Sequence, residues 1–517
     1  MSFPESRSVY VISDLHLGGD YGKTDLARGF RINTHVRELS EFVTDLARRP
    51  VSQPLELVVN GDMVDFLAER EARADPSGSE WAPFTIDAGR ACDKLHAIAA
   101  RDPDRTFFAA LRGLLDAGHR LVILPGNHDI ELELPAVRRK LRQVVGVKPG
   151  HDYEFINAGE AYIVGDALIE HGNRYDKWNQ VNHDQLRRIS SLQSRLQPIP
   201  DGIHFDPPPG SKMVAWVINP IKQDYQFIDL IKPEADVAVP LLLALEPGYR
   251  RILATVAKLA LEVRSQGMRT AAVPRRVSDI NKSAGDRVFH VKDIGSFPTE
   301  MGETFDEEDG EGGEEDALEQ VLNRCLDGGG SAFLDSVGLT AESASGAANV
   351  RSIGQRVDRT WSLAQLLLAR DDADVGKRLP ALLMALRALE KDRSFDLEHD
   401  GPNSYTRAAD ELMVKGNLKY AVFGHTHLAK KVELGPGRWY LNSGTWSDLI
   451  QLPQEILAGT ESEARAKLEP FLLAISSGSL QPWIRFRPTY VRLDIDESDQ
   501  VVGAELCHYS LMTSADK

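Results

Sequence analysis

The sequence has few cysteines and no long apolar run. Its three cysteines, Cys92, Cys325 and Cys507, are far apart and form no C-x-x-C pair, so neither a disulfide framework nor a thiolate metal site is expected. No apolar stretch approaches the roughly 20 residues needed to span a bilayer. The N-terminus also lacks the basic start and long apolar core of a signal peptide. These absences favour a cytoplasmic protein without a transmembrane segment.

The sequence has fewer basic than acidic residues. It contains 60 lysines and arginines and 77 aspartates and glutamates, which gives a net charge of -17. Residues 306–319 alone carry nine acidic residues and no basic one. We expect an acidic disordered loop at about 300–318, with a partner-binding segment as the alternative. Because an acidic chain repels phosphate backbones at long range, nucleic acid is possible as a substrate but not favoured.

The length of 517 residues exceeds one ordinary domain. Near the N-terminus, short apolar runs alternate with amphipathic helical patterns at 35–49 and 107–118, a rhythm typical of an α/β sheet. The predicted strands there are 8–13, 55–60 and 120–125, and 161–172 is predicted to form a hairpin that turns at Gly165-Asp166. Further strands are predicted at 419–427, 438–446, 488–495 and 503–510.

The middle of the chain has helical spacing instead, for example at 248–267 and 375–392. We therefore predict one α/β domain formed by 1–177 and 401–517, interrupted by a mainly helical insertion at 178–400. Its apolar stripes predict the core of a cap. The alternative is a peripheral membrane contact through 212–233, which mixes aromatic, aliphatic and lysine residues.

Clusters of polar residues follow five of the predicted strands. In open α/β sheets such positions gather beyond the carboxyl ends of the strands, and residues two apart in extended chain point to the same side. Seven of these residues offer oxygen or nitrogen ligands: Asp14, His16, Asp62, Asn127, His171, His425 and His427. That is too many for one ion, so we expect two divalent ions that share a carboxylate. The ligand types suit Mn, Fe or Zn, and such a pair can promote phosphoryl displacement.

Each residue also has a structural alternative, since an isolated Asp or Asn after a strand usually caps a helix or shapes a turn. For Asp129 we keep this interpretation, as a local hydrogen-bond acceptor. Arg174 and Trp178 could contact substrate, but an ion pair and a packing ring explain them equally well.

The order D-x-H, G-D-x-x-D, G-N-H-D, a later His-Gly and G-H-x-H resembles the pattern of calcineurin-like metallophosphoesterases, over about 8–177 and 415–450. The resemblance implies a four-layer α/β/β/α sandwich with two divalent metal ions and hydrolysis by a metal-bridging hydroxide. We favour Mn as the metal, with Fe or Zn as the alternatives. It assigns one metal to Asp14, His16 and His427. It assigns the other to Asn127, His171 and His425, with Asp62 as the bridge.

The same resemblance implies catalytic roles for two residues that do not bind metal. His128 would protonate the leaving oxygen as general acid, and Asp65 would orient its ring. This implies a phosphodiesterase or pyrophosphatase acting on a small-molecule or lipid-linked ester. A nuclease, a phosphomonoesterase and a non-catalytic scaffold on the same fold are the alternatives. The substrate-binding residues and the oligomeric state are left open.

Within the superfamily, the block layout is most similar to the bacterial UDP-2,3-diacylglucosamine hydrolase-like phosphoesterases. The chain departs from them at His128, where they usually have arginine, at Asn173, where they have aspartate, and in its long insertion. It departs from the protein phosphatases at Phe66, where they carry a phosphate-binding arginine.

Overall fold

The computed structural model describes residues 6–20, 30–50, 55–71, 79–232, 241, 375–387, 395–477 and 479–510. The predicted helix at 248–267 and the acidic segment lie outside these ranges.

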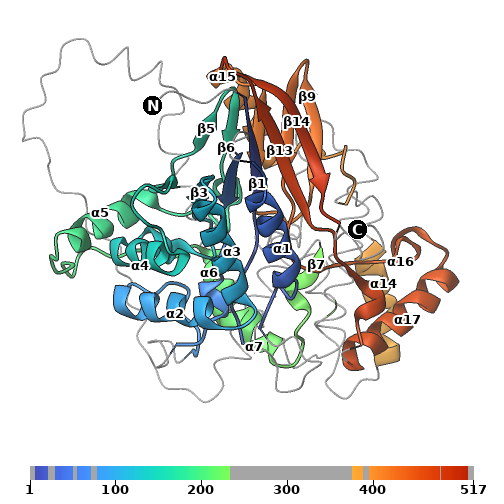
Figure 1. Cartoon of the computed structure of the whole chain (residues 1–517). Coiled ribbons are helices and arrows are strands. Elements are labelled where there is room, and N and C mark those ends of the chain that lie inside the picture. Colours follow the sequence, from blue (N-terminus) through green and yellow to red (C-terminus); the bar gives the residue numbers. More distant parts are fainter. Residues whose placement is uncertain are drawn as a thin grey trace, which may run out of the picture.

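The first of two large sheets has six strands in the order β14-β13-β1-β2-β3-β4. Its strands β1 to β4 run parallel and β13 pairs antiparallel to β1, with Val9 opposite Leu493. Strands from the N-terminal and C-terminal parts of the chain, β1 and β13, therefore lie side by side in one sheet (Figure 1). The strands are β1 (Arg7–Ile12), β2 (Leu55–Asn60), β3 (Arg120–Leu124), β4 (Tyr153–Phe155), β13 (Thr489–Ile495) and β14 (Val501–His508).

The second sheet has five strands in the order β5-β6-β8-β10-β9. The hairpin β5–β6 turns at Gly165-Asp166 as predicted, and Gly165 has a φ of 57°, a left-handed conformation that favours glycine. The strands are β5 (Tyr162–Val164), β6 (Ala167–Ile169), β8 (Tyr420–Phe423), β9 (Lys430–Gly435) and β10 (Arg438–Asn442).

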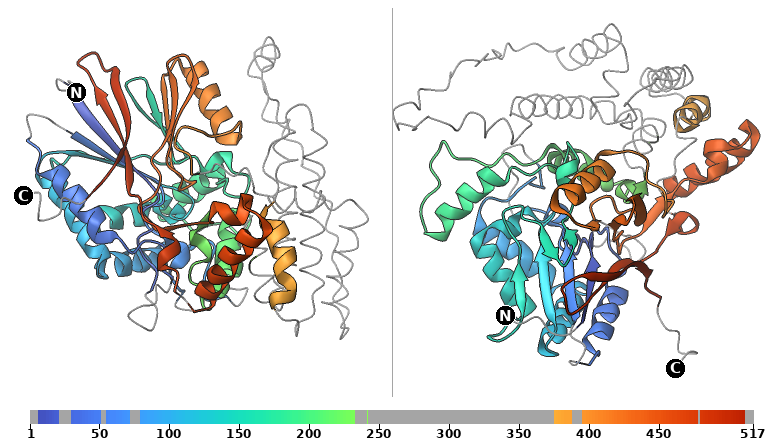
Figure 2. Two further views of the ribbon diagram at one scale, coloured as in Figure 1. Left: turned by 90° about the vertical axis from the view of Figure 1, so that its right-hand side faces the viewer. Right: turned by 90° about the horizontal axis from the view of Figure 1, so that it is seen from above.

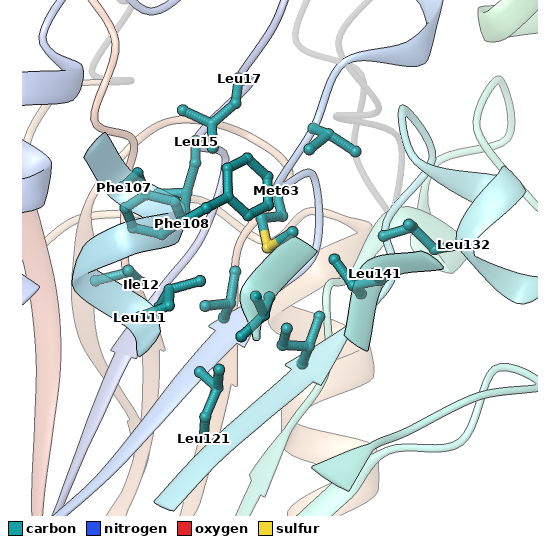
Figure 3. Close-up of a cluster of buried hydrophobic side chains, with 14 of the residues drawn as sticks. Ile12, Leu15, Leu17, Met63, Phe107, Phe108, Leu111, Leu121, Leu132 and Leu141 are labelled. Carbon is teal, nitrogen blue, oxygen red and sulfur yellow. The ribbon is translucent and has the colours of Figure 1, made fainter. Parts of the chain in front are cut away.

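Strand β1 shows how the layers arise from alternation along the sequence. Val9 and Val11 belong to the apolar cluster between the two sheets, together with Ile169 of β6. Tyr10 and Ile12 point to the opposite face and join the cluster under the first layer of helices. Figure 3 shows part of that cluster.

Helices cover the outer faces of both sheets. Four of them, α1 (Val36–Ala47), α2 (Ala88–Ala100), α3 (Asp104–Asp116) and α4 (Pro135–Val145), pack on the first sheet. On the second sheet, α15 (Ser404–Gly416) buries Ala409 and Met413 against β8 and β10. The predicted α/β/β/α four-layer sandwich is confirmed.

The region predicted as the insertion begins with α5 (His183–Ser194), which packs on α4 through Leu186 and Ile189. A helical run then covers α6 (Pro209–Met213), a π-helical turn (Val214–Ile218) and α7 (Asn219–Lys222). The strand β7 (Ile231–Lys232) and helix α14 (Val375–Arg387) follow in the same region. Short 3-10 turns lie at Phe66–Ala68, Ile130–Glu133, Asn173–Tyr175, Ile228–Leu230 and Gln481–Trp483.

A second apolar core joins this region to a segment that follows β10. Val217, Ile221 and Leu382 pack there with Ile450 and Phe471. The later segment comprises β11 (Leu449–Gln451), α16 (Gln454–Ala458), α17 (Glu461–Ser477) and β12 (Ile484–Arg485), and β11 pairs with β7. The helices α14, α16 and α17 lie together beside the sandwich (Figures 1 and 2). The domain boundaries at 177/178 and 400/401 stay predictions.

The segment 212–233, considered above as a membrane contact, buries much of its apolar surface in this second core. Val217, Phe227 and Ile228 are at most 5% exposed. Among the described residues, no helix has the length and apolarity that crossing a membrane requires.

Candidate metal centre

The predicted ligands lie in loops that follow the carboxyl ends of β1, β2, β3, β6 and β8. The first loop is tied to the second, because the backbone N–H groups of Leu15 and His16 both donate to the Asp62 carbonyl at 2.9 Å. The loop after β8 is tied to the first, because the N–H of His425 donates to both carboxylate oxygens of Asp14, at 3.1 and 3.0 Å. The two sheets thus contribute to one site.

One group of side chains consists of Asp14, His16 and His427, whose candidate ligand atoms all lie within 4.8 Å of one another. Nε2 of His427 lies 3.4 Å from Oδ1 of Asp14 and 3.0 Å from Nε2 of His16. Asp14 is fully buried and His427 is 9% exposed. These are the residues that the family resemblance assigns to one metal ion.

A second group consists of Asp62, His171 and His425, with the same 4.8 Å spread. Nε2 of His171 lies 3.2 Å from Oδ2 of Asp62, and Nδ1 of His171 lies 2.8 Å from the Asn60 carbonyl, to which it must donate. When this imidazole is neutral, its lone pair is therefore on Nε2, the atom that faces Asp62.

Asp62 lies between the two groups. Its Oδ2 atom is 3.9 Å from Nε2 of His16 and 3.2 Å from Nε2 of His171. Its Oδ1 atom accepts a 2.8 Å hydrogen bond from the N–H of His128. Asn127 directly precedes His128 and is buried at 3% exposure. The structure thus gathers all seven predicted ligands in one place.

The backbone at the site adopts conformations that non-glycine residues rarely take. Five of the predicted ligands have positive φ, between 44° and 67°: Asp14, His16, Asp62, His425 and His427. Such strain persists only where the surroundings impose it, and it concentrates at functional sites. No pattern in the sequence predicted that these residues adopt the left-handed backbone conformation.

Close packing at the site also requires glycine. A Cβ atom at Gly126 would lie 2.1 Å from Oδ1 of Asp62, and one at Gly61 would lie 2.2 Å from Nδ1 of His171. The two glycines therefore let neighbouring loops approach the ligands.

Asp65 lies between two histidines. Its Oδ1 atom is 3.1 Å from Nδ1 of His128, and its Oδ2 atom is 3.5 Å from Nδ1 of His16. The side chain of His128 is 16% exposed, whereas that of Asp65 is 3% exposed. Burial opposes the charged form of Asp65, but His128 and His16 hold its pKa well below the usual range. The ionised Asp65 can therefore accept a hydrogen bond from a protonated Nδ1 of His128.

Charges within the site are strongly coupled. Burial disfavours a charge on His171, yet the Asp62 and Asp14 carboxylates outweigh it and raise the pKa of His171 to about 10. His427 behaves in the opposite way: burial and then the Lys232 ammonium hold its pKa well below the usual range. Lys232 belongs to β7, in the region predicted as the insertion.

Asp129 serves as a local acceptor, as predicted. Its two oxygens accept from the N–H groups of Gly126, at 2.6 Å, and Met63, at 2.8 Å. Nε of Arg174 lies 3.1 Å from the Glu170 carboxylate, and Trp178 packs against the second core. Both arrangements agree with the structural alternatives.

Sequence reasoning missed Asp176 and Asn179, which contact predicted ligands. Oδ2 of Asp176 lies 3.1 Å from Nε2 of His425, and Oδ1 of Asn179 accepts a 3.3 Å hydrogen bond from Nδ2 of Asn127. The one available signal was a carboxylate five residues after His171, in the same block EHGNRYD.

The donor set fits divalent cations. It combines carboxylate oxygens, an amide oxygen and imidazole nitrogens without sulfur. The amide oxygen of Asn127 is buried and has no hydrogen-bond partner within the described part of the chain. A buried acceptor of this kind is costly unless something else binds it, and a cation would do so.

Comparison with protein-family models matches residues 7–222 to the model described as calcineurin-like phosphoesterase. The matched range includes Asp14, His16, Asp62, Asn127 and His171, and it ends before the G-H-x-H block. A search of the curated proteins found no match for the chain.

Proposed function

We propose that the chain, whose residues 7–222 match the calcineurin-like phosphoesterase model, is a metal-dependent phosphodiesterase or pyrophosphatase of that superfamily. The family supports phosphoester hydrolysis with divalent metal ions in general. The single observation that carries the proposal is the meeting of the predicted metal ligands with the pair His128 and Asp65 in one site.

We assign one metal to Asp14, His16 and His427 and the other to Asn127, His171 and His425, with Asp62 shared. When bound, the two ions supply Lewis acidity and an activated water for attack on phosphorus. The oxygen and nitrogen donors suit Mn best in our proposal, with Fe or Zn as alternatives.

His128 is the proposed general acid. Asp65 accepts from Nδ1, which leaves Nε2 as the ring atom that delivers a proton. The side chain of His128 is the more exposed member of this pair, so a substrate can reach it. Protonation matters most when the leaving group is a poor one, such as an alkoxide or a phosphate. This favours diesters and phosphoanhydrides.

Lys232 is proposed to bind the substrate. Its ammonium acts on His427 from the insertion, where it can attract an anionic oxygen of the ester. A small-molecule or lipid-linked phosphoester in the cytoplasm is our proposed substrate class.

Turnover of two model esters tests the proposal. Protein stripped of metal and reloaded with Mn is assayed with bis-p-nitrophenyl phosphate and p-nitrophenyl phosphate, and Asp62→Asn serves as the blank. Faster cleavage of the diester supports the proposal. Faster cleavage of the monoester would make the protein a phosphomonoesterase. No turnover above the blank, despite two bound ions, would favour a binding scaffold instead.

A further inference from the structure

Four side chains form a continuous hydrogen-bonded chain behind the second proposed metal site. Nδ2 of Asn127 donates to Oδ1 of Asn179 at 3.3 Å, and Nδ2 of Asn179 donates to Oδ2 of Asp176 at 2.7 Å. The same Oδ2 atom lies 3.1 Å from Nε2 of His425. The chain thus begins at one proposed ligand of this site and ends at another.

The direction of the hydrogen bonds follows from Asp176. Its Oδ1 atom accepts from the N–H of Trp178 at 2.9 Å, and its Oδ2 atom accepts from Asn179. Because both oxygens already accept from N–H donors, Nε2 of His425 must donate to this carboxylate. The lone pair of the His425 ring is then on Nδ1, as metal binding through that atom requires.

The same logic fixes the two amides. Asn179 must turn its NH2 group toward the acceptor Asp176, so its oxygen faces Asn127. Asn127 must therefore turn its own NH2 group toward Asn179. The Oδ1 atom of Asn127 is then available to bind a metal ion. This atom is buried and has no hydrogen-bond partner in the described ranges. One carboxylate thus sets the orientation of both ligands.

We propose that Asp176 and Asn179 are positioning residues that orient Asn127 and His425 toward one divalent metal ion. This inference rests on the proposed two-metal site and goes beyond it, because it concerns residues that contact no metal. It predicts that binding of the ion at Asn127, His171 and His425 depends on Asp176, and that binding of the other ion does not.

Helix α6, which contains Gly210, adjoins this chain of residues. The N–H of Gly210 donates to the Trp178 carbonyl at 2.7 Å. A Cβ atom at position 210 would lie 2.1 Å from Oδ1 of Asn179, so Gly210→Ala must displace the Asn179 side chain. Gly202 offers a matched control, since a Cβ atom there would meet nothing within 4 Å.

The experiment is a Mn titration of the full chain, followed by equilibrium dialysis and electron paramagnetic resonance. Wild type is expected to bind two ions with a spectrum of coupled Mn. In Asp176→Asn the side chain keeps its shape but has only one acceptor oxygen. We expect the second ion to bind about 10- to 100-fold more weakly, with the spectrum of isolated Mn at intermediate concentrations. Gly210→Ala should act in the same direction and Gly202→Ala should not.

Three outcomes would overturn the inference. Two coupled ions in Asp176→Asn with wild-type affinity would exclude a positioning role while leaving the two-metal site intact. Equal loss of both ions, with a lower melting temperature of the metal-stripped protein, would make Asp176 a general structural residue. If wild type bound fewer than two ions, the proposed two-metal site would fail together with the inference. Should Asp176→Asn not fold, Gly210→Ala against Gly202→Ala decides.

Discussion

Nδ1 of His128 lies 3.1 Å from Oδ1 of Asp65, although 63 positions separate the two residues in the sequence. They follow different strands of the first sheet, β3 and β2, and meet at its carboxyl edge. The pair has the geometry of a histidine whose ring is held in place by a carboxylate.

Replacing His128 by alanine should slow hydrolysis in proportion to how much the leaving group needs a proton. We expect a loss of about 10²- to 10⁴-fold for a diester with an alkyl leaving group. The loss should be much smaller for p-nitrophenolate, which leaves readily as an anion. Rates on matched esters of the two kinds measure the difference. His96→Ala, an exposed histidine on α2, is the control. An equal loss on both esters would contradict a role in protonation.

Asp65→Asn should keep the shape of the site but weaken the orientation of His128. We expect turnover to fall by about 10- to 100-fold, the range seen for such supporting contacts. Metal content must be measured alongside, because Asp65 also lies 3.5 Å from His16. A fall in turnover with full metal content supports the role in orienting His128. Wild-type turnover would contradict it.

Lys232→Met should remove the positive charge that acts on His427 and that we propose binds the substrate. A hydrogen bond to a charged group contributes about 1.5–3 kcal/mol, so we expect kcat/KM for an anionic diester to fall about 10- to 100-fold. Metal content should stay unchanged. Lys415→Met, on an exposed lysine of α15, is the control. An unchanged kcat/KM would exclude Lys232 from substrate binding.

Much of the sandwich can be predicted from the sequence because its strands alternate or are uniformly apolar and end in polar clusters. The predicted strands at 8–13, 55–60 and 120–125 correspond to β1, β2 and β3 within one residue. The candidate ligands could be selected from the sequence because each block places its polar residues directly after a strand. Periodicity and turn chemistry are local, so they can predict local structure.

The relationships between distant segments could not be predicted in this way. Asp176 and His425 are 249 positions apart, and no local pattern connects them. The pairing of β11 with β7 likewise joins the segment after β10 to the insertion. These contacts depend on how the segments pack, which a single sequence does not encode as a local period.

A buried glutamate away from the proposed ligands makes stability depend on pH. Glu131 is 2% exposed and accepts a 2.8 Å hydrogen bond from the N–H of Thr85. Burial raises its pKa from 4.5 to about 7, and the positive charge of Lys94 offsets part of this rise. The folded state therefore holds a proton that the unfolded state releases. This stabilisation is fully present below pH 4.5 and is lost as the pH rises through about 7.

Glu131→Gln should remove that dependence. A shift of this size corresponds to a change of about 3 kcal/mol in the free energy of unfolding. The variant should therefore unfold at a higher urea concentration than wild type at pH 8. At pH 5 the two proteins should unfold at similar urea concentrations. Urea unfolding of metal-stripped protein at both values measures it. Glu41→Gln, on the exposed face of α1, should leave the wild-type pH dependence in place. If the stability of Glu131→Gln kept the pH dependence of wild type, groups other than Glu131 would be its cause.

The most direct test of the two-metal account is anomalous diffraction from crystals grown with Mn. The account predicts two anomalous peaks about 3.5–4 Å apart. One would lie among Asp14, His16 and His427, and the other among Asn127, His171 and His425, with Asp62 contacting both. A single peak, or peaks that these side chains do not contact, would contradict it.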